Sequence, residues 1–192
     1  LYSAEVTGNP GNCSYPHKHV ILDEASLKAA ICHDYVCAEY KNSYRNGENF
    51  IGSDCLPVDC DNDHSEKPED WVTPDDVMQA FPGVTFAIHY SRFHHREKNG
   101  KPARPKFHVL LPIEYVTDPA LYSDMKKLVN SIFPYFDTQA LDAARFFFGT
   151  TAAEVALYPG RMNLTEYLDE DIFDEDMAQG QYDNSVIPEG SR

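Results

Sequence analysis

Three segments of the chain place apolar residues at the spacing of an α-helix, and each predicts one helix. The first covers residues 26–40. The second, residues 73–81, begins with a threonine as N-cap followed by proline, a pattern typical of helix starts. The third covers residues 117–133, with a threonine or aspartate cap. Its predicted buried stripe consists of Leu121, Met125, Leu128, Val129 and Ile132.

Alternation of apolar and polar residues predicts strands at four places. They are residues 55–61, 84–93, 106–113 and 144–150. A polar stretch with Gly and Pro separates the second from the third, so we expect these two to pair as antiparallel neighbours. An Asn-Gly dipeptide at residues 46–47 signals a tight turn between strands.

Helices and strands interleave irregularly, with hairpin-like partners, which favours an α+β fold over a doubly wound parallel sheet. The length of 192 residues suits one domain, and 42% hydrophobic residues are typical of a globular chain. We assign residues 1–165 to this domain. Residues 166–192 are expected to be an acidic segment and a linker.

The cysteines and the lack of long apolar runs favour a cytoplasmic protein. No run approaches about 18 apolar residues, so no membrane-spanning helix and no membrane partner is expected. The chain shows no secretion signal, and its five cysteines have no CxxC spacing, which is typical of a reduced, intracellular protein. A zinc site made of Cys13, His17, His19 and Cys32 stays open as an alternative.

Charge is distributed unevenly along the chain. The net charge of −15 argues against a general nucleic-acid-binding protein, because phosphate binding depends on Lys and Arg. However, residues 92–106 hold six of the 16 basic residues: Arg92, Arg96, Lys98, Lys101, Arg104 and Lys106. Residues 166–176 hold seven acidic residues in eleven positions. We therefore expect one basic face on an acidic molecule.

Three aspartates stand at alternate positions in the sequence PVDCDND. If residues 55–61 form a strand, Asp59 and Asp61 share one face and can bind a divalent ion between them. Mg²⁺ needs only one or two carboxylates when phosphates and water complete its shell. A solvated acidic turn is the plain alternative. An EF-hand is disfavoured, because His64 stands where that loop needs Gly.

A second group of polar residues follows in the strand at residues 106–113. If the strand extends back to Arg104, then Arg104, Lys106 and His108 project from one face and suit a triphosphate. Further along, Asp137 ends the third helix, where either a cation or an Asx turn explains it. Arg145 opens the last predicted strand and must leave its apolar face or pair with an acid.

These motifs, in this order, resemble the archaeo-eukaryotic primase superfamily, most closely the primase–polymerase domains of phage and plasmid replication proteins. That family is marked by an hDhD strand, a [S/K]xH strand and an hD motif followed by Arg. Here they are similar to PVDCDN, RPKFH and YFDTQALDAAR. The resemblance implies an RRM-like or ferredoxin-like antiparallel sheet core with flanking helices and an N-terminal α/β subdomain.

The resemblance also implies roles for particular residues. The metal-binding carboxylates would be Asp59, Asp61 and Asp137. The nucleotide contacts would be His108, Lys106, Arg104, Arg145 and Arg45. Lys106 stands where many members have serine. Template or primer contacts are expected from Arg92, Arg96, Lys98 and Lys101 in the basic segment.

The function that the resemblance implies is a template-dependent nucleotidyltransferase, a DNA primase or polymerase that uses two Mg²⁺ or Mn²⁺ ions and no organic cofactor. Its partners would be a single-stranded or primed DNA template, dNTP or NTP, and a fused or associated helicase module beyond IPEGSR. Two alternatives stay open. One is a metal-dependent nuclease or nickase, with His17, His19 or the His94–His95 pair assisting. The other is a non-catalytic nucleotide-binding module on a ferredoxin-like sheet.

Overall fold

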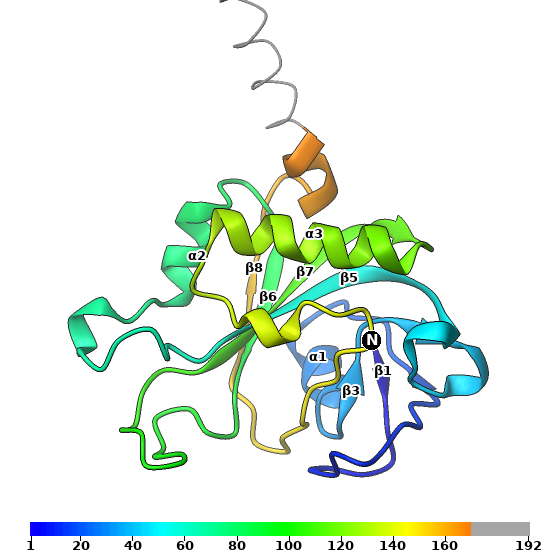
Figure 1. The fold of residues 1–192 in the computed structure, drawn as a ribbon, viewed down its shortest axis with the longest axis horizontal. Helices are drawn as coiled ribbons and strands as arrows, with labels where there is room; N and C mark the ends of the chain where they lie inside the picture. Colours follow the sequence, from blue (N-terminus) through cyan, green and yellow to red (C-terminus); the bar gives the residue numbers. More distant parts are fainter. Residues whose placement is uncertain (170–192) are drawn as a thin grey trace, which may run out of the picture.

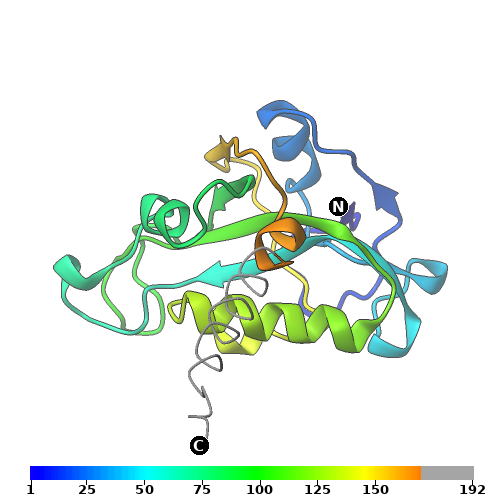
Figure 2. The same cartoon turned by 90° about the horizontal axis from the view of Figure 1, so that it is seen from above.

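The computed structural model describes residues 1–169 of the chain. Its centre is a five-stranded antiparallel sheet with the strand order β4-β5-β7-β6-β8. These strands are Glu39–Tyr40 (β4), Phe50–Cys60 (β5), Phe86–Tyr90 (β6), Phe107–Val116 (β7) and Val155–Tyr158 (β8). Figure 2 shows β5 and β7 running side by side along the molecule, and this pairing is the longest in the sheet.

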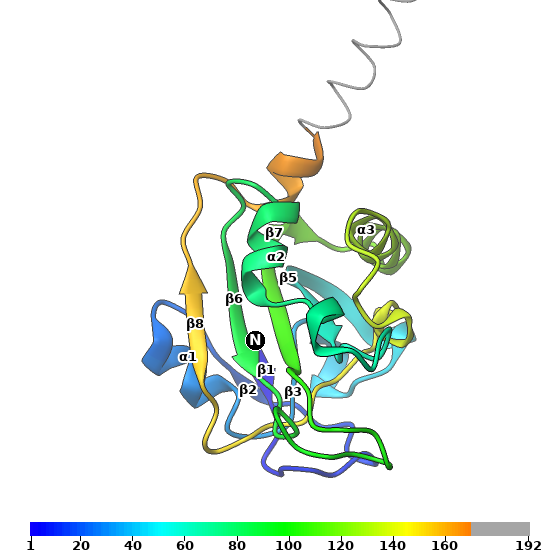
Figure 3. The same cartoon turned by 90° about the vertical axis from the view of Figure 1, so that its left-hand side faces the viewer.

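Helices and a smaller sheet cover the five strands. The helices are Glu24–Ala30 (α1), Pro74–Ala80 (α2) and Pro119–Ile132 (α3), and residues 164–169 are also helical. A three-stranded sheet of order β2-β1-β3 contains Tyr2–Ser3 (β1), His17–Lys18 (β2) and Tyr35–Val36 (β3). In Figure 1, α2 and α3 lie together above the strands, whereas α1, β1 and β3 lie below them. Figure 3 shows α1 beside β8, at the edge of the sheet.

Two apolar clusters pack against the two faces of the main sheet. The larger joins Leu56, Val58, Ile88 and Val109 of the strands to α2 and α3. The smaller joins α1 and β3 to Leu110 of β7 and to the segment after α3. Side chains alternate between the faces along each strand, so every second residue of β5, β6 and β7 is directed away from the larger cluster. Asp59, His89 and His108 occupy such positions.

The fold is α+β, with antiparallel sheets and flanking helices. The succession β5-α2-β6-β7-α3 places β7 between β5 and β6. This strand arrangement belongs to RRM-like and ferredoxin-like sheets. The edges differ from that pattern, because β8 pairs with β6 while β4 takes the edge beside β5.

The first predicted helix is wrong in its second half. It begins with a capping box between Asp23 and Ser26, but it ends at Ala30. Residues 35–36 instead pair with β1 as a strand. An aromatic and a β-branched residue at these positions suit a strand, and this tertiary pairing overrides the helical spacing.

The third helix is confirmed, but its predicted buried stripe is wrong in part. Tyr122, Lys126 and Val129 are buried, whereas Leu121 and Leu128 are exposed. The tyrosine hydroxyl and the lysine amine donate hydrogen bonds to backbone carbonyls of β5 and of the segment after the helix. Amphipathic side chains can therefore be buried here, with their polar ends satisfied.

The last predicted strand, residues 144–150, is also wrong. Only Phe147 forms a bridge, with Tyr35, and the rest of the segment belongs to no strand. The edge strand that does form is β8, which the alternation did not predict. The predicted antiparallel pairing of β6 with β7 is confirmed. The expected turn between two strands is found between β4 and β5, which pair with each other. It is not a tight turn, because two 3₁₀ turns, Lys41–Ser43 and Gly47–Asn49, make the connection.

None of the helices within residues 1–169 has the length and apolar character needed to cross a bilayer. The division of the chain at residue 165 stays a prediction. Most of the acidic segment at residues 166–176 lies outside the described residues.

Candidate active site

Strand register places three polar side chains in one row across the sheet. Asp59 of β5 is opposite His108 of β7, and His108 is opposite His89 of β6. Directly opposed residues point to the same face of a sheet. This face is the one turned away from the larger apolar cluster, as the alternation in residues 55–61 predicts, and all three side chains are buried.

Asp59 has positive neighbours and no matched hydrogen-bond donor. His108 Nδ1 lies 3.1 Å and Arg145 Nη2 lies 3.9 Å from its two carboxylate oxygens. Within residues 1–169, no donor makes a well-aligned hydrogen bond to Asp59 Oδ1. Burial raises the pKa of Asp59, but the close contact with His108 and the positive charge of Arg145 outweigh burial and hold this pKa below its ordinary value.

Asp137 is brought to Asp59 by the backbone. Its N–H donates a 2.7 Å hydrogen bond to the Asp59 carbonyl. It also caps the 3₁₀ turn Thr138–Ala140, where one carboxylate oxygen accepts from the Gln139 N–H at 2.9 Å. Asp137 therefore makes the Asx turn that was the plain alternative for it, and it still lines the same cavity as Asp59.

An ion-pair cluster lies just beyond the paired ends of β5 and β7. Lys106 Nζ lies 3.2 Å from Asp61 and 3.8 Å from Asp63. Lys101 pairs with Asp63 at 2.8 Å. Burial raises the pKa of Asp63. The hydrogen bond from Lys101 and the neighbouring cations outweigh burial, so this pKa lies below its ordinary value. Three acidic residues in five positions are tolerated here because cations from the basic segment partly neutralise them.

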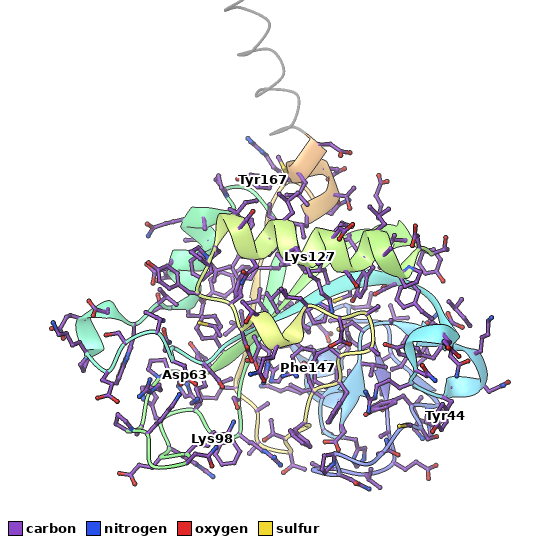
Figure 4. All side chains as sticks on the ribbon, viewed as in Figure 1. Tyr44, Asp63, Lys98, Lys127, Phe147 and Tyr167 are labelled. Atoms are coloured by element: carbon purple, nitrogen blue, oxygen red, sulfur yellow. The ribbon has the colours of Figure 1, made fainter. Side chains whose placement is uncertain are left out.

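A cavity of about 650 Å³ opens on this face of the sheet. It is lined by four of the predicted nucleotide- and template-binding residues, His108, Arg145, Arg92 and Lys98, and by the three predicted metal-binding residues, Asp59, Asp61 and Asp137. Figure 4 shows Asp63 and Lys98 in the lower left of the view and Phe147 below the short helix that follows α3. Acidic and basic side chains from distant parts of the sequence thus line one cavity.

Other predicted site residues lie elsewhere. Arg104 and Lys106 precede β7 and are buried. Arg104 donates to the carbonyls of Asn62 and Ser65, so it holds the acidic loop. Arg45 donates to the Ala144 carbonyl and lies over the Phe146 ring. Five predicted site residues therefore do not line the cavity: Arg104, Lys106, Arg45, Arg96 and Lys101.

The zinc alternative finds no support in the described part of the chain. Cys13 contacts Arg45, His19 hydrogen-bonds Ser3 and Cys32 donates to the Lys28 carbonyl. Within residues 1–169 no three His, Cys, Asp or Glu side chains are close enough to form a ready metal cage. His17 and His19, proposed for the nickase, do not line the cavity.

The cavity nevertheless offers carboxylates of the kind that bind Mg²⁺ together with other ligands. Asp59 carries a buried carboxylate oxygen that accepts no hydrogen bond from the described residues, and such a group calls for a partner. Asp61 and Asp137 line the same cavity. Mg²⁺ is bound in phosphoryl-transfer sites by one or two carboxylates together with substrate phosphates, so a complete protein cage is not required.

The segment that carries Arg145 is fixed by an unusually close backbone approach at Gly149. A Cβ at this position would overlap the carbonyl carbon and oxygen of His33. We predict that Gly149→Ala lowers the free energy of unfolding by about 2–3 kcal/mol, because the obstructing atoms belong to the backbone. Urea unfolding measures the effect. Gly47→Ala is the matched control, since no atom lies within 4 Å of a Cβ there. Equal stability of the two variants would contradict the close packing.

Sequence reasoning missed His89 and Tyr35. His89 Nε2 lies 2.6 Å from the Tyr35 hydroxyl, and its ring centroid is 4.5 Å from that of His108. Tyr35 stacks on Phe147, whose ring meets His108 edge-on. The His89 and Phe147 rings therefore pack against His108 and support the site. The alternation in residues 84–93 could have found His89, because it places His89 on the face opposite Ile88.

Burial and the nearby charge of His108 hold the pKa of His89 well below its ordinary value. The folded chain therefore keeps His89 neutral, whereas the unfolded chain binds a proton below about pH 6.5. We predict that the free energy of unfolding falls as pH decreases through this range, by about 1.4 kcal/mol per pH unit for this one proton. Denaturant titrations at about pH 7.5 and 5.5 measure the slope, which His89→Phe should reduce. An unchanged slope in that variant would disprove the assignment.

Comparison with known proteins adds a distant structural likeness. No family model matches the sequence, and no curated protein matches it. The fold is similar to that of a solved structure of the archaeo-eukaryotic primase domain of the cyanophage S-2L primase-polymerase. The sequence identity is 11%, the TM-score is 0.47, and the alignment covers 77% of this chain and 76% of that one.

Proposed function

We propose that the protein is a template-dependent nucleotidyltransferase that joins nucleotides from (d)NTPs, as DNA primases and polymerases do. One observation carries this proposal. The carboxylates of Asp59, Asp61 and Asp137 line the same cavity as the His108 imidazole and the Arg145 guanidinium. Carboxylates for divalent ions next to cations for a triphosphate are the parts that phosphoryl transfer requires. The three sequence motifs supply the same residues in the same roles.

In this proposal the acidic residues bind the metal ions and the basic residues contact the phosphates. Asp59, Asp61 and Asp137 would hold Mg²⁺ or Mn²⁺, which activates a primer hydroxyl and neutralises the leaving pyrophosphate. His108 and Arg145, already within ion-pair distance of Asp59, can turn to the phosphate oxygens of the nucleotide. Lys106 orients Asp61 from a buried position. Arg104 and Arg45 are left out of the nucleotide contacts, because backbone carbonyls occupy them.

The test measures nucleotide incorporation by the purified protein on primed and unprimed single-stranded templates, with Mg²⁺ or Mn²⁺ and each set of four nucleotides. We expect metal-dependent extension of a labelled primer. A parallel incubation of the same DNA with metal and without nucleotides separates synthesis from cleavage. If the DNA is cut and never extended, the protein is a nuclease and the proposal is wrong.

A further inference from the structure

A second wall of the same cavity combines aromatic rings with the cations of Arg92 and Lys98. The Arg92 guanidinium lies 4.3 Å from the Phe148 ring centroid and 5.2 Å from that of Phe93. Lys98 Nζ lies 5.1 Å from the Phe93 centroid. All four side chains line the cavity. The two rings are half-buried and Arg92 is exposed, so a ligand can reach the charge and the part of each ring that the cations leave uncovered.

The backbone fixes the rings of this wall. Phe147 exchanges two hydrogen bonds with Tyr35, at 2.8 and 2.9 Å, and its ring is buried against Tyr35 and His108. The Phe146 and Phe148 rings meet edge to face with centroids 5.1 Å apart, and both residues line the cavity. Phe93 is placed by a turn in which its N–H donates to the Ser91 hydroxyl. Rings held in this way lose little freedom when a ligand stacks on them.

Within the described residues, the cations of the wall lie over aromatic rings but pair with no acidic side chain. Lys101, Arg104 and Lys106 of the same basic segment pair with Asp61 or Asp63. Arg92 and Lys98, by contrast, form no ion pair with any residue in the range 1–169. A ligand that fits both features has flat aromatic groups and repeated negative charges.

We propose that Arg92, Phe93, Lys98 and Phe148 form a stacking site for the bases of a single-stranded nucleic acid. Aromatic rings stack bases of any sequence, and Arg and Lys contact the phosphates between them. A duplex is disfavoured, because its bases already stack on one another and show no open face. The inference rests on the proposed function, since the strand bound here would be the one that is copied at Asp59.

The test is binding of a fluorescein-labelled oligothymidylate, followed by anisotropy, in the presence of EDTA and without nucleotides. We expect Phe93→Ala and Phe148→Ala each to weaken binding about tenfold, as loss of one stacked base does. Phe148→Trp should restore binding, and its indole fluorescence should be quenched by the oligonucleotide. Tyr115→Ala is the matched control, because this exposed tyrosine lies outside the cavity and should leave the affinity unchanged.

Several outcomes would overturn the stacking site. One is wild-type affinity in both alanine variants while their circular dichroism is unaltered. Another is equal competition by a duplex, and a third is equal competition by free dTTP, which would assign the rings to a mononucleotide. Should the alanine variants unfold, quenching in Phe148→Trp still decides the matter, since its absence rejects the site.

The stacking site and the proposed function can fail separately. Asp59→Asn should retain oligonucleotide binding while it loses incorporation. If the wild-type protein binds single strands through Phe148 but incorporates no nucleotide, the proposed function is wrong and the stacking site stands. If Phe148→Ala incorporates nucleotides with an unchanged KM for template, the stacking site is wrong and the function stands.

Discussion

Replacing Asp59 with asparagine should reduce nucleotide incorporation by a factor on the order of 10²–10³ and leave the fold intact. This carboxylate is buried at one end of the row Asp59–His108–His89 and lies 3.1 Å from His108 Nδ1 and 3.9 Å from Arg145 Nη2. Asparagine keeps its shape but removes the negative charge that a divalent ion requires. Loss of one preorganised charge-stabilising group at such a site typically costs two to three orders of magnitude. Single-turnover incorporation on a primed template measures the loss.

The control for this substitution is Asp54→Asn. Asp54 lies on the same strand, five residues before Asp59, but it is exposed and does not line the site cavity. We expect it to incorporate nucleotides at the wild-type rate. Thermal unfolding should show that both variants are folded. If Asp59→Asn is as active as Asp54→Asn, the carboxylates of this cavity do not hold the catalytic ions.

The part of the site that the sequence could predict is the part that strand periodicity fixes. Alternation in residues 55–61 sets Asp59 opposite the core face, and the same alternation in residues 106–113 does so for His108. Because the two strands pair in register, the residues meet. Local patterns of period two suffice when both partners are long, regular strands. The ordered motifs then added Asp137 and Arg145.

The residues whose positions were predicted wrongly lie outside regular strands and helices, where the sequence has no repeating pattern to guide the prediction. Arg104 was expected to extend the face of β7, but the strand begins only at Phe107 and the guanidinium turns into the loop after β5. Residues 144–150 have strand composition, but within residues 1–169 they form a single bridge, with Tyr35. Their path depends on hydrogen bonds to residues more than 100 positions away in sequence. Such contacts leave no pattern within a short window.

The clearest of these long-range anchors is Asp34. Its carboxylate is fully buried and accepts hydrogen bonds from the backbone N–H groups of Gly8, Asn9 and Gly149, at 2.8, 2.9 and 2.9 Å. One side chain thus ties the N-terminal region to the segment that carries Arg145. We predict that Asp34→Ala lowers the free energy of unfolding by about 3–5 kcal/mol, because three amides lose a charged acceptor at once.

Asp34→Asn removes the negative charge of the side chain and keeps its shape. The amide keeps one acceptor oxygen, so it can serve only part of the three donors, and we expect a smaller loss of about 1–3 kcal/mol. Urea unfolding ranks the variants, with Asp23→Ala as a control for an exposed aspartate that only caps α1. Hydrogen exchange at the Gly149 amide supplies a local readout, and it should accelerate in both Asp34 variants. If that amide stays protected in Asp34→Ala, the segment with Arg145 and Phe148 is held by its pairing with Tyr35 alone. The geometry of the cavity would then depend on β3 and not on this buried carboxylate.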